Sequence, residues 1–222
     1  TLSQPIEGVP EVYNEEQGGL LDVTLAPDFD ESRRVYLTYA KPMGDGMSGT
    51  AAAYGTLSDD RTQLTDVQEI FAQEPPSPTP MHYGSRLVFD RTGHVYITTG
   101  EHFTEEERRY AQDMDTTYGK VVRLTPEGEV AAGNPFADEG MPQEQIWSLG
   151  HRNIQGAAMR PGTDEFWVIE HGPAGGDELN LIEAGANYGW PEVTYGKNYD
   201  GSQVTGGDYR HEEAGFTPTR YY

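Results

Sequence analysis

The chain has 222 residues and is strongly acidic: 37 Asp and Glu stand against 15 Lys and Arg, a formal net charge of −22. Such a surface repels phosphate groups, which argues against nucleic acids and anionic membranes as partners. Cysteine is absent, so disulfides, thiolate nucleophiles and cysteine-based zinc sites are excluded. No apolar run has the length of a membrane span, and residues 1–10 lack the pattern of a signal peptide.

The basic residues are themselves unevenly represented, with 12 Arg but only three Lys. An excess of negative charge destabilises a compact chain unless salt screens it, a condition that halophilic proteins tolerate. We therefore expect a halophilic protein whose melting temperature rises between low and molar salt.

Glycine and proline are frequent, with 27 and 15 residues, which favours many short strands joined by turns. The predicted strands, rich in β-branched and aromatic residues, are 34–40, 93–99, 119–125 and 165–170. The proline-rich segment 74–80 is expected to be a rigid connector. Residues 104–113 are the best helix candidate, with Thr104 as a candidate cap. Because this segment is almost wholly polar, we expect an insertion or one exposed turn.

An internal repeat organises the chain. Three segments begin at Gln17, His82 and Asn153, and each places small residues, an apolar strand and a turn before a strand with an aromatic residue. When the turns are aligned, His82 and Asn153 lie eight residues before the turn, and Gln17 lies ten before it. Repeated hairpins with the same entry predict β-propeller blades, with ordinary β-sandwich hairpins as the alternative.

Equivalent positions of propeller blades converge at one end of the central channel. We therefore expect Gln17, His82 and Asn153, with the neighbouring Arg152, to form a polar ring there. An imidazole can remove a proton from a substrate hydroxyl near neutral pH, so His82 is the candidate base. The remaining histidines, which lack this placement, are expected to be structural or exposed: His94, His102, His151, His171 and His211.

Two further motifs carry candidate chemistry. Arg152 and Asn153 place a guanidinium beside a carboxamide, a pair that can polarise a carbonyl or quinone oxygen, unless Arg152 simply pairs with a surface acid. Residues 170–180 combine carboxylates, an amide and backbone carbonyls in a glycine-rich loop. These hard oxygen ligands suit Ca²⁺, with a plain acidic turn as the alternative. No P-loop or GxSxG motif occurs, so nucleotide binding and serine hydrolysis lack support.

The sequence resembles the soluble quinoprotein glucose/sorbosone dehydrogenase family, and its aldose sugar dehydrogenase branch in particular. The matching stretches follow the family's order over nearly the whole chain: EEQGGLLDVTLAPDF, HYGSRLVFD, GHVYITTGE, AQDMDTTYGKVVRL, NPF, IWSLGHRNIQG, EHGPAGGDELNLI and GANYGWPEVTYGKNYDG. The family usually has glycine where Ser85 stands. The resemblance implies an all-β, six-bladed β-propeller, with residues 1–222 as a single partial domain of about four blades in an incomplete member.

The resemblance also implies an activity. Family members oxidise the anomeric hydroxyl of aldoses to lactones, transfer hydride to pyrroloquinoline quinone (PQQ), require Ca²⁺ and pass electrons to an external acceptor. They work in the periplasm or outside the cell. The alternatives are a non-catalytic propeller that binds carbohydrate or a protein partner, and a calcium-dependent propeller lactonase, which would leave Arg152 and Asn153 without a role.

Site residues follow from the same resemblance. His82 matches the general base, and Arg152 and Asn153 match contacts to the quinone, where Arg152 would stabilise negative charge on its oxygen. Gln17 and Tyr199 match further cofactor contacts. The resemblance also implies the metal ligands: the carbonyls of Gly172 and Pro173 for the Ca²⁺ beside the cofactor, and Glu178 with the backbone of Tyr188 for a second, structural Ca²⁺.

Overall fold

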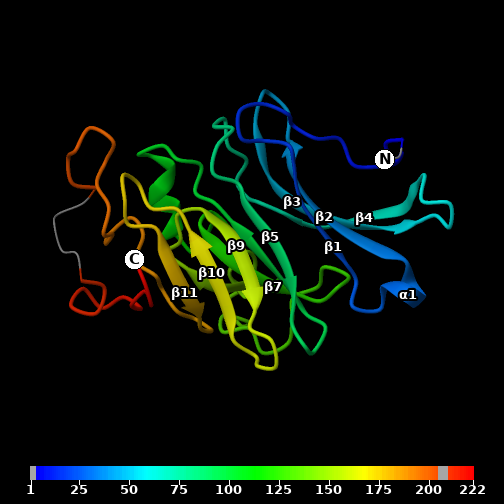
Figure 1. Ribbon diagram of the computed structural model, residues 1–222. Helices are drawn as coiled ribbons and strands as arrows, with labels where there is room; N and C mark the ends of the chain where they lie inside the picture. Colours follow the sequence, from blue (N-terminus) through cyan, green and yellow to red (C-terminus); the bar gives the residue numbers. More distant parts are fainter. Residues whose placement is uncertain (1–3, 205–209) are drawn as a thin grey trace.

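Three antiparallel β-sheets dominate this computed structural model, which describes residues 4–204 and 210–222 (Figure 1). The first sheet contains β1 (Leu20–Leu25), β2 (Arg34–Pro42), β3 (Ser48–Leu57) and β4 (Leu64–Ala72). The second contains β5 (Gly84–Phe89), β6 (Val95–Thr99), β7 (Lys120–Leu124) and β8 (Ile146–Leu149). The third contains β9 (Ile154–Met159), β10 (Phe166–Glu170) and β11 (Glu178–Ile182). Strands in each sheet pair in chain order, the pattern of propeller blades.

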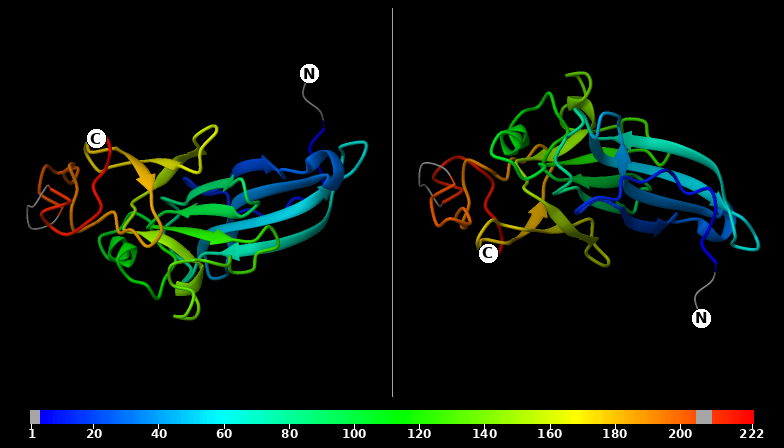
Figure 2. Two further views of the ribbon diagram at one scale, coloured as in Figure 1. Left: turned by 90° about the horizontal axis from the view of Figure 1, so that it is seen from below. Right: turned by 90° about the horizontal axis from the view of Figure 1, so that it is seen from above.

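The first strands of the three sheets lie next to one another. The Asp22 carboxylate of β1 accepts the Leu87 N–H of β5 at 3.2 Å. The Arg86 Nε of β5 donates to the Gln155 carbonyl of β9 at 2.7 Å. A cavity of about 580 Å³ is lined by residues of all three of these strands. The three sheets lie side by side (Figure 2). This is the arrangement that the sequence repeat predicts.

The structure has three sheets where about four blades were expected. After β11 the described residues are mostly loops. Tyr221 forms an isolated antiparallel bridge with Leu179 of β11, which extends the third sheet at its edge. Residues 4–204 and 210–222 therefore form two four-stranded blades and a third of three strands with this bridge.

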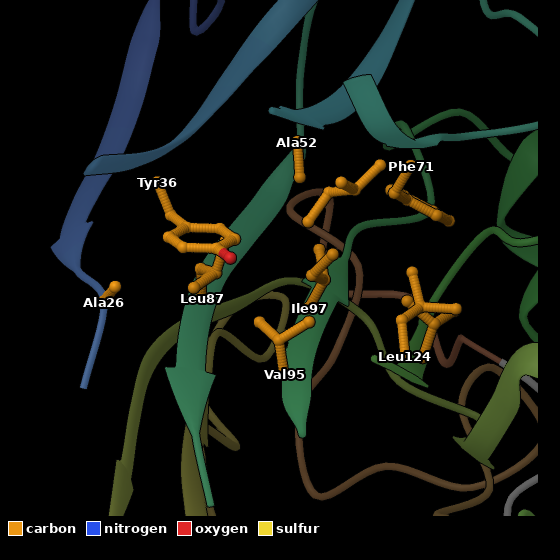
Figure 3. Close-up of a cluster of buried hydrophobic side chains, with 10 residues drawn as sticks. Ala26, Tyr36, Ala52, Phe71, Leu87, Val95, Ile97 and Leu124 are labelled. Atoms are coloured by element: carbon orange, nitrogen blue, oxygen red, sulfur yellow. The ribbon is translucent and has the colours of Figure 1, made fainter. Parts of the chain in front are cut away.

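The hydrophobic core is divided between the two interfaces of the middle sheet. Side chains alternate along a strand, so Val95 and Ile97 of β6 pack against the first sheet, around Tyr36 (Figure 3). Tyr96, between them, packs on the opposite side against Phe166 of the third sheet. Full burial of a Val or Ile side chain contributes about 1.5–3 kcal/mol, so both interfaces stabilise the middle sheet.

The four predicted strands are confirmed as β2, β6, β7 and β10. Three short helices accompany them: α1 (Phe29–Ser32), η1 (Glu107–Ala111) and η2 (Gln143–Gln145). No helix among the described residues is long and apolar enough to cross a membrane.

The predicted helix 104–113 is reduced to the 3₁₀ helix η1. The expected cap is present, since the Thr104 hydroxyl accepts the Glu107 N–H at 3.1 Å. The expectation of an exposed turn is wrong for Glu107 and Ala111, which are buried. The Glu107 carboxylate accepts hydrogen bonds from the hydroxyls of Ser77 and Thr79, and so ties η1 to the proline-rich connector.

Candidate active site

The polar ring expected from the repeat is present. The Gln17 side-chain carbonyl accepts the His82 backbone N–H at 2.9 Å, and that of Asn153 accepts the Gly84 N–H at 3.0 Å. These bonds fix the amide orientations, so both NH₂ groups remain as donors. Gln17, His82 and Asn153 also line one cavity of about 400 Å³. The complete lining is Gln17, His82, Arg152, Asn153, Gln155, His171, Gly172, Pro173, Asp177 and Tyr199.

His82 is held at this cavity by a buried carboxylate. Its Nδ1 lies 2.9 Å from Oε1 of Glu101, which is fully buried at the end of β6. An ionised carboxylate accepts only, so in the neutral imidazole the proton lies on Nδ1 and the lone pair on Nε2. Nε2 has no hydrogen-bond partner among the described residues. The arrangement leaves one basic nitrogen for a ligand in the cavity.

Glu101 is the functional residue that the sequence does not reveal. It follows the predicted strand 93–99, 19 residues after His82. The sequence held one indication of this contact: His82 precedes and Glu101 follows the same predicted hairpin. Pairing of its two strands brings the residue before the first strand close to the residue after the second. Antiparallel partners Gly84 and Thr99 bring the two ends together.

Arg152 lies beside this pair and is itself almost buried. Its Nη1 donates to the carbonyls of His171 and Gly172, at 3.1 and 2.7 Å, and its guanidinium lies over the Trp190 ring at 5.2 Å. Its Nε lies 3.8 Å from the Glu101 carboxylate and makes no hydrogen bond. The alternative of a surface ion pair is therefore wrong, because the nearby acid is buried.

A second histidine–glutamate pair has the same geometry as His82 and Glu101, but it is buried away from the cavity. His151 Nδ1 lies 2.9 Å from Glu170 Oε1, again 19 residues along the chain. Its Nε2 bonds the Ser148 hydroxyl at 2.9 Å, and its ring stacks on Tyr188. Both nitrogens are thus occupied and the ring is fully buried. His151 is structural, as expected.

The other histidines divide between buried and partly exposed positions. His102 is fully buried between the Thr79 carbonyl and the Gln73 side chain. His94 bonds Thr92 at the β5–β6 turn. His171 is exposed, as expected, and it lines the cavity.

The glycine-rich loop after β10 brings backbone oxygens to the cavity. Gly172 and Pro173 line it, and the Gly172 N–H donates to Asp177 at 2.9 Å. A Cβ at Gly172 would lie 2.3 Å from the carbonyl oxygens of Gly175 and Gly176, so only glycine fits this turn.

A buried acidic cluster lies behind this loop. Asn180 Nδ2 donates to Glu170 and to Glu178, at 2.9 and 3.1 Å, while Asn180 Oδ1 is buried without a partner. Burial, reinforced by the negative charge of Glu170, raises the pKa of Glu178 to about 8. His211 lies next to both the Glu178 carboxylate, at 3.5 Å, and the Tyr188 backbone. The tyrosine hydroxyl is bonded to the Leu181 carbonyl.

These groups fit an oxygen-liganded cation. Two adjacent carboxyl groups and an orphaned amide oxygen are hard donors, and a Ca²⁺ ion would stabilise the charged form of Glu178 that burial and Glu170 disfavour. No group of three His, Asp or Glu side chains poised for a metal exists among the described residues, so backbone oxygens would have to complete the site.

The cavity at His82 offers hydrogen-bond donors to carbonyl or carboxylate oxygens of a ligand. Arg152 is the one Lys or Arg among its described lining residues. The amides of Gln17 and Asn153 add neutral donors, and Tyr199 adds an exposed aromatic ring. All predicted cofactor-contact residues are therefore brought together.

The three sheets, whose first strands lie next to one another and line one cavity, define a β-propeller arrangement, and the polar cavity at His82 is its candidate site. The model of the family described as Glucose / Sorbosone dehydrogenase matches residues 1–222, and the chain belongs to that family. The chain is 50% identical over 203 residues to aldose sugar dehydrogenase YliI of Escherichia coli, covering 91% of this chain and 54% of that protein.

Solved structures of aldose sugar dehydrogenases agree with this family membership. The apo form of soluble aldose sugar dehydrogenase from Escherichia coli, a six-bladed propeller, matches with a TM-score of 0.86 and 50% identity, over 90% of this chain and 57% of that one. The PQQ-bound aldose sugar dehydrogenase from Streptomyces coelicolor matches with a TM-score of 0.73 and 32% identity, over 88% and 55%. The chain thus spans about half the length of these relatives.

Proposed function

We propose that this chain is part of a PQQ- and Ca²⁺-dependent aldose sugar dehydrogenase that oxidises the anomeric hydroxyl of sugars to lactones. The observation that carries the proposal is the meeting of His82, Glu101 and Arg152 at one polar cavity in a member of this family. When bound, PQQ supplies the two-electron acceptor; an external acceptor then takes the electrons. We also propose one domain across 1–222, since the middle sheet packs against both of its neighbours.

His82 acts as the base. Its Nε2 takes the proton of the anomeric hydroxyl, because Nδ1–H is held by Glu101 at 2.9 Å. The Glu101 carboxylate stabilises the imidazolium that forms, and it fixes the ring orientation. Glu101 is a positioning residue, since it acts through His82.

Arg152 supplies fixed positive charge in the cavity. Its stacking on Trp190 and its bonds to backbone carbonyls hold the guanidinium in place, so it does not have to reorganise when negative charge develops on a bound oxygen. Gln17 and Asn153 would orient the cofactor through their free NH₂ groups, and Tyr199 would add an aromatic contact.

Two cations complete the proposal. The carbonyls of Gly172 and Pro173 would hold the Ca²⁺ next to the cofactor, on the cavity wall that they already form. Glu178 and the backbone of Tyr188 would hold the second, with the orphaned Asn180 oxygen nearby. By analogy with its relatives, we place the enzyme in the periplasm or outside the cell.

The test uses the full-length protein loaded with PQQ and Ca²⁺. We expect dye-linked oxidation of aldoses, and its loss in His82→Ala with an unchanged circular dichroism spectrum. His94→Ala, at a histidine of the β5–β6 turn outside the cavity, is the matched control and should retain turnover. Unchanged turnover in His82→Ala would reject the base. No turnover in the loaded wild type would favour a non-catalytic propeller that binds carbohydrate or a protein.

A further inference from the structure

An aromatic side chain beside the base has no role in the chemistry described so far. Phe103 follows β6 and Glu101, and its ring lies edge-on to the His82 ring, with centroids 5.1 Å apart and planes at 87°. Although it touches a nearly buried histidine, the Phe103 side chain is 38% exposed. Phe103 is not itself a lining residue of the cavity, but its ring contacts His82, which is one, so part of an exposed apolar ring lies next to the base.

The backbone holds Phe103 in an unfavourable conformation. Its φ is +76°, and that of the preceding His102 is +62°, both in the left-handed region that bulky residues rarely adopt. Strain of this kind persists only where surrounding contacts enforce it, and it concentrates at functional sites. Here the His102 carbonyl accepts the Thr104 N–H at 2.9 Å, and the buried His102 ring anchors the turn.

One carboxylate ties Phe103 to the base. Glu101 accepts the His82 ring N–H with Oε1 and the Phe103 backbone N–H with Oε2. The position of the Phe103 ring relative to His82 is therefore fixed by the same group that orients the base.

A second aromatic ring lies near that of Phe103. Tyr199, which lines the cavity and is largely exposed, lies 6.4 Å from Phe103 with the ring planes tilted by 33°. The two rings present apolar surface next to an otherwise polar cavity. Pyranose sugars have an apolar C–H face that packs on aromatic rings while their hydroxyls bond polar groups.

We propose that Phe103 is a specificity-determining residue whose ring packs against the C–H face of the aldose and directs its anomeric hydroxyl to His82. This inference rests on the proposed function, since it concerns the substrate of that site. The residue binds substrate and takes no part in proton transfer.

The experiment compares variants of the full-length, PQQ- and Ca²⁺-loaded enzyme. Phe103→Ala removes the ring. Because alanine still has a Cβ, the positive φ of this residue stays as unfavourable as in the wild type. We expect KM for aldoses to rise about three- to tenfold, the range of an aromatic contact, with kcat and its pH profile changed by less than about twofold. Phe103→Tyr should restore KM. Phe136→Ala, at a partly buried phenylalanine outside the cavity, should leave both parameters unchanged.

A binding measurement separates this inference from the proposed function. The probe is 1,5-anhydroglucitol, which has the pyranose C–H face but no anomeric hydroxyl, and its Kd is measured by saturation-transfer NMR. Phe103→Ala should weaken Kd by the same factor as KM. A fall in kcat with a shifted pH profile and unchanged KM would mean that Phe103 positions His82, and would overturn the inference, as would no change at all. Absent turnover in a wild type that binds the probe refutes the function alone; absent probe binding refutes the inference.

Discussion

Lys120, at the start of β7, allows a test of whether burial changes the protonation of a lysine in the folded chain. Lys120 is fully buried, and its Nζ donates to three carbonyls, those of Tyr110, Ala111 and Tyr118, at 2.8, 3.1 and 2.7 Å. Burial lowers the pKa of Lys120 to about 7, against a smaller opposing effect of Asp113. We predict that Lys120→Met changes the pH dependence of stability.

The sign follows from the lowered pKa. Between about pH 7 and the ordinary lysine value of 10.5, the unfolded chain binds the proton that the folded chain has released. The contribution of Lys120 to stability, read as the difference between the wild type and Lys120→Met, must therefore rise with pH in this window and be flat below it. At about 1.4 kcal/mol per unit, the gain over the variant from about pH 7 to about pH 9 is about 2 kcal/mol.

The variant also loses hydrogen bonds at every pH. The carbonyls of Tyr110 and Ala111 keep other donors, the N–H groups of Asp113 and Gly150. The Tyr118 carbonyl is left without a partner, which costs about 1–3 kcal/mol. This constant offset does not alter the slope with pH.

The assay is urea unfolding of wild type and variant at about pH 5, 6, 7, 8 and 9. Lys41→Met is the matched control, at a half-exposed lysine paired with Glu69. Wild type and Lys120→Met curves that run parallel across this range would refute the argument, since they would mean that Lys120 keeps its proton in the folded chain.

Three further predictions concern the site and the surface. Glu101→Gln should lower kcat of the loaded enzyme about 100-fold or more with the fold retained, because an amide cannot accept from both the His82 ring and the Phe103 N–H; an unchanged kcat would contradict this role. Added Ca²⁺ should raise the melting temperature of the wild type but not of Glu178→Gln, which lacks one of the two repelling carboxylates; an equal rise in both would argue against that cation site. Molar KCl should raise the melting temperature, because salt screens the net charge of −22; no rise would reject halophily.

Much of the architecture follows from local pattern. The strands show in the sequence because alternate residues pack into two cores, as Val95 and Tyr96 do. The polar ring was predictable because equivalent positions in repeated hairpins converge, which places Gln17, His82 and Asn153 together. Family resemblance supplied Tyr199 and the metal ligands, which no repeat indicates.

What escaped prediction depends on contacts between distant segments. Glu101 gains its importance only when β5 and β6 pair and bring it to His82. The burial of Glu107 depends on the connector hydroxyls folding over it, and that of Lys120 on three carbonyls of the loop before β7. A polar segment with such long-range partners cannot be distinguished from a solvated one by periodicity.

The enclosure of the middle sheet has a consequence for the chemistry. β6 and β7 are covered by side chains of both neighbouring sheets, and Glu101 follows β6 directly. Native proteins open first at their periphery, and amide protons of enclosed strands exchange with solvent last. Local opening of the outer sheets would therefore leave the bond between Glu101 and His82 intact. The proposed proton removal would then take place in the part of the fold that opens most slowly.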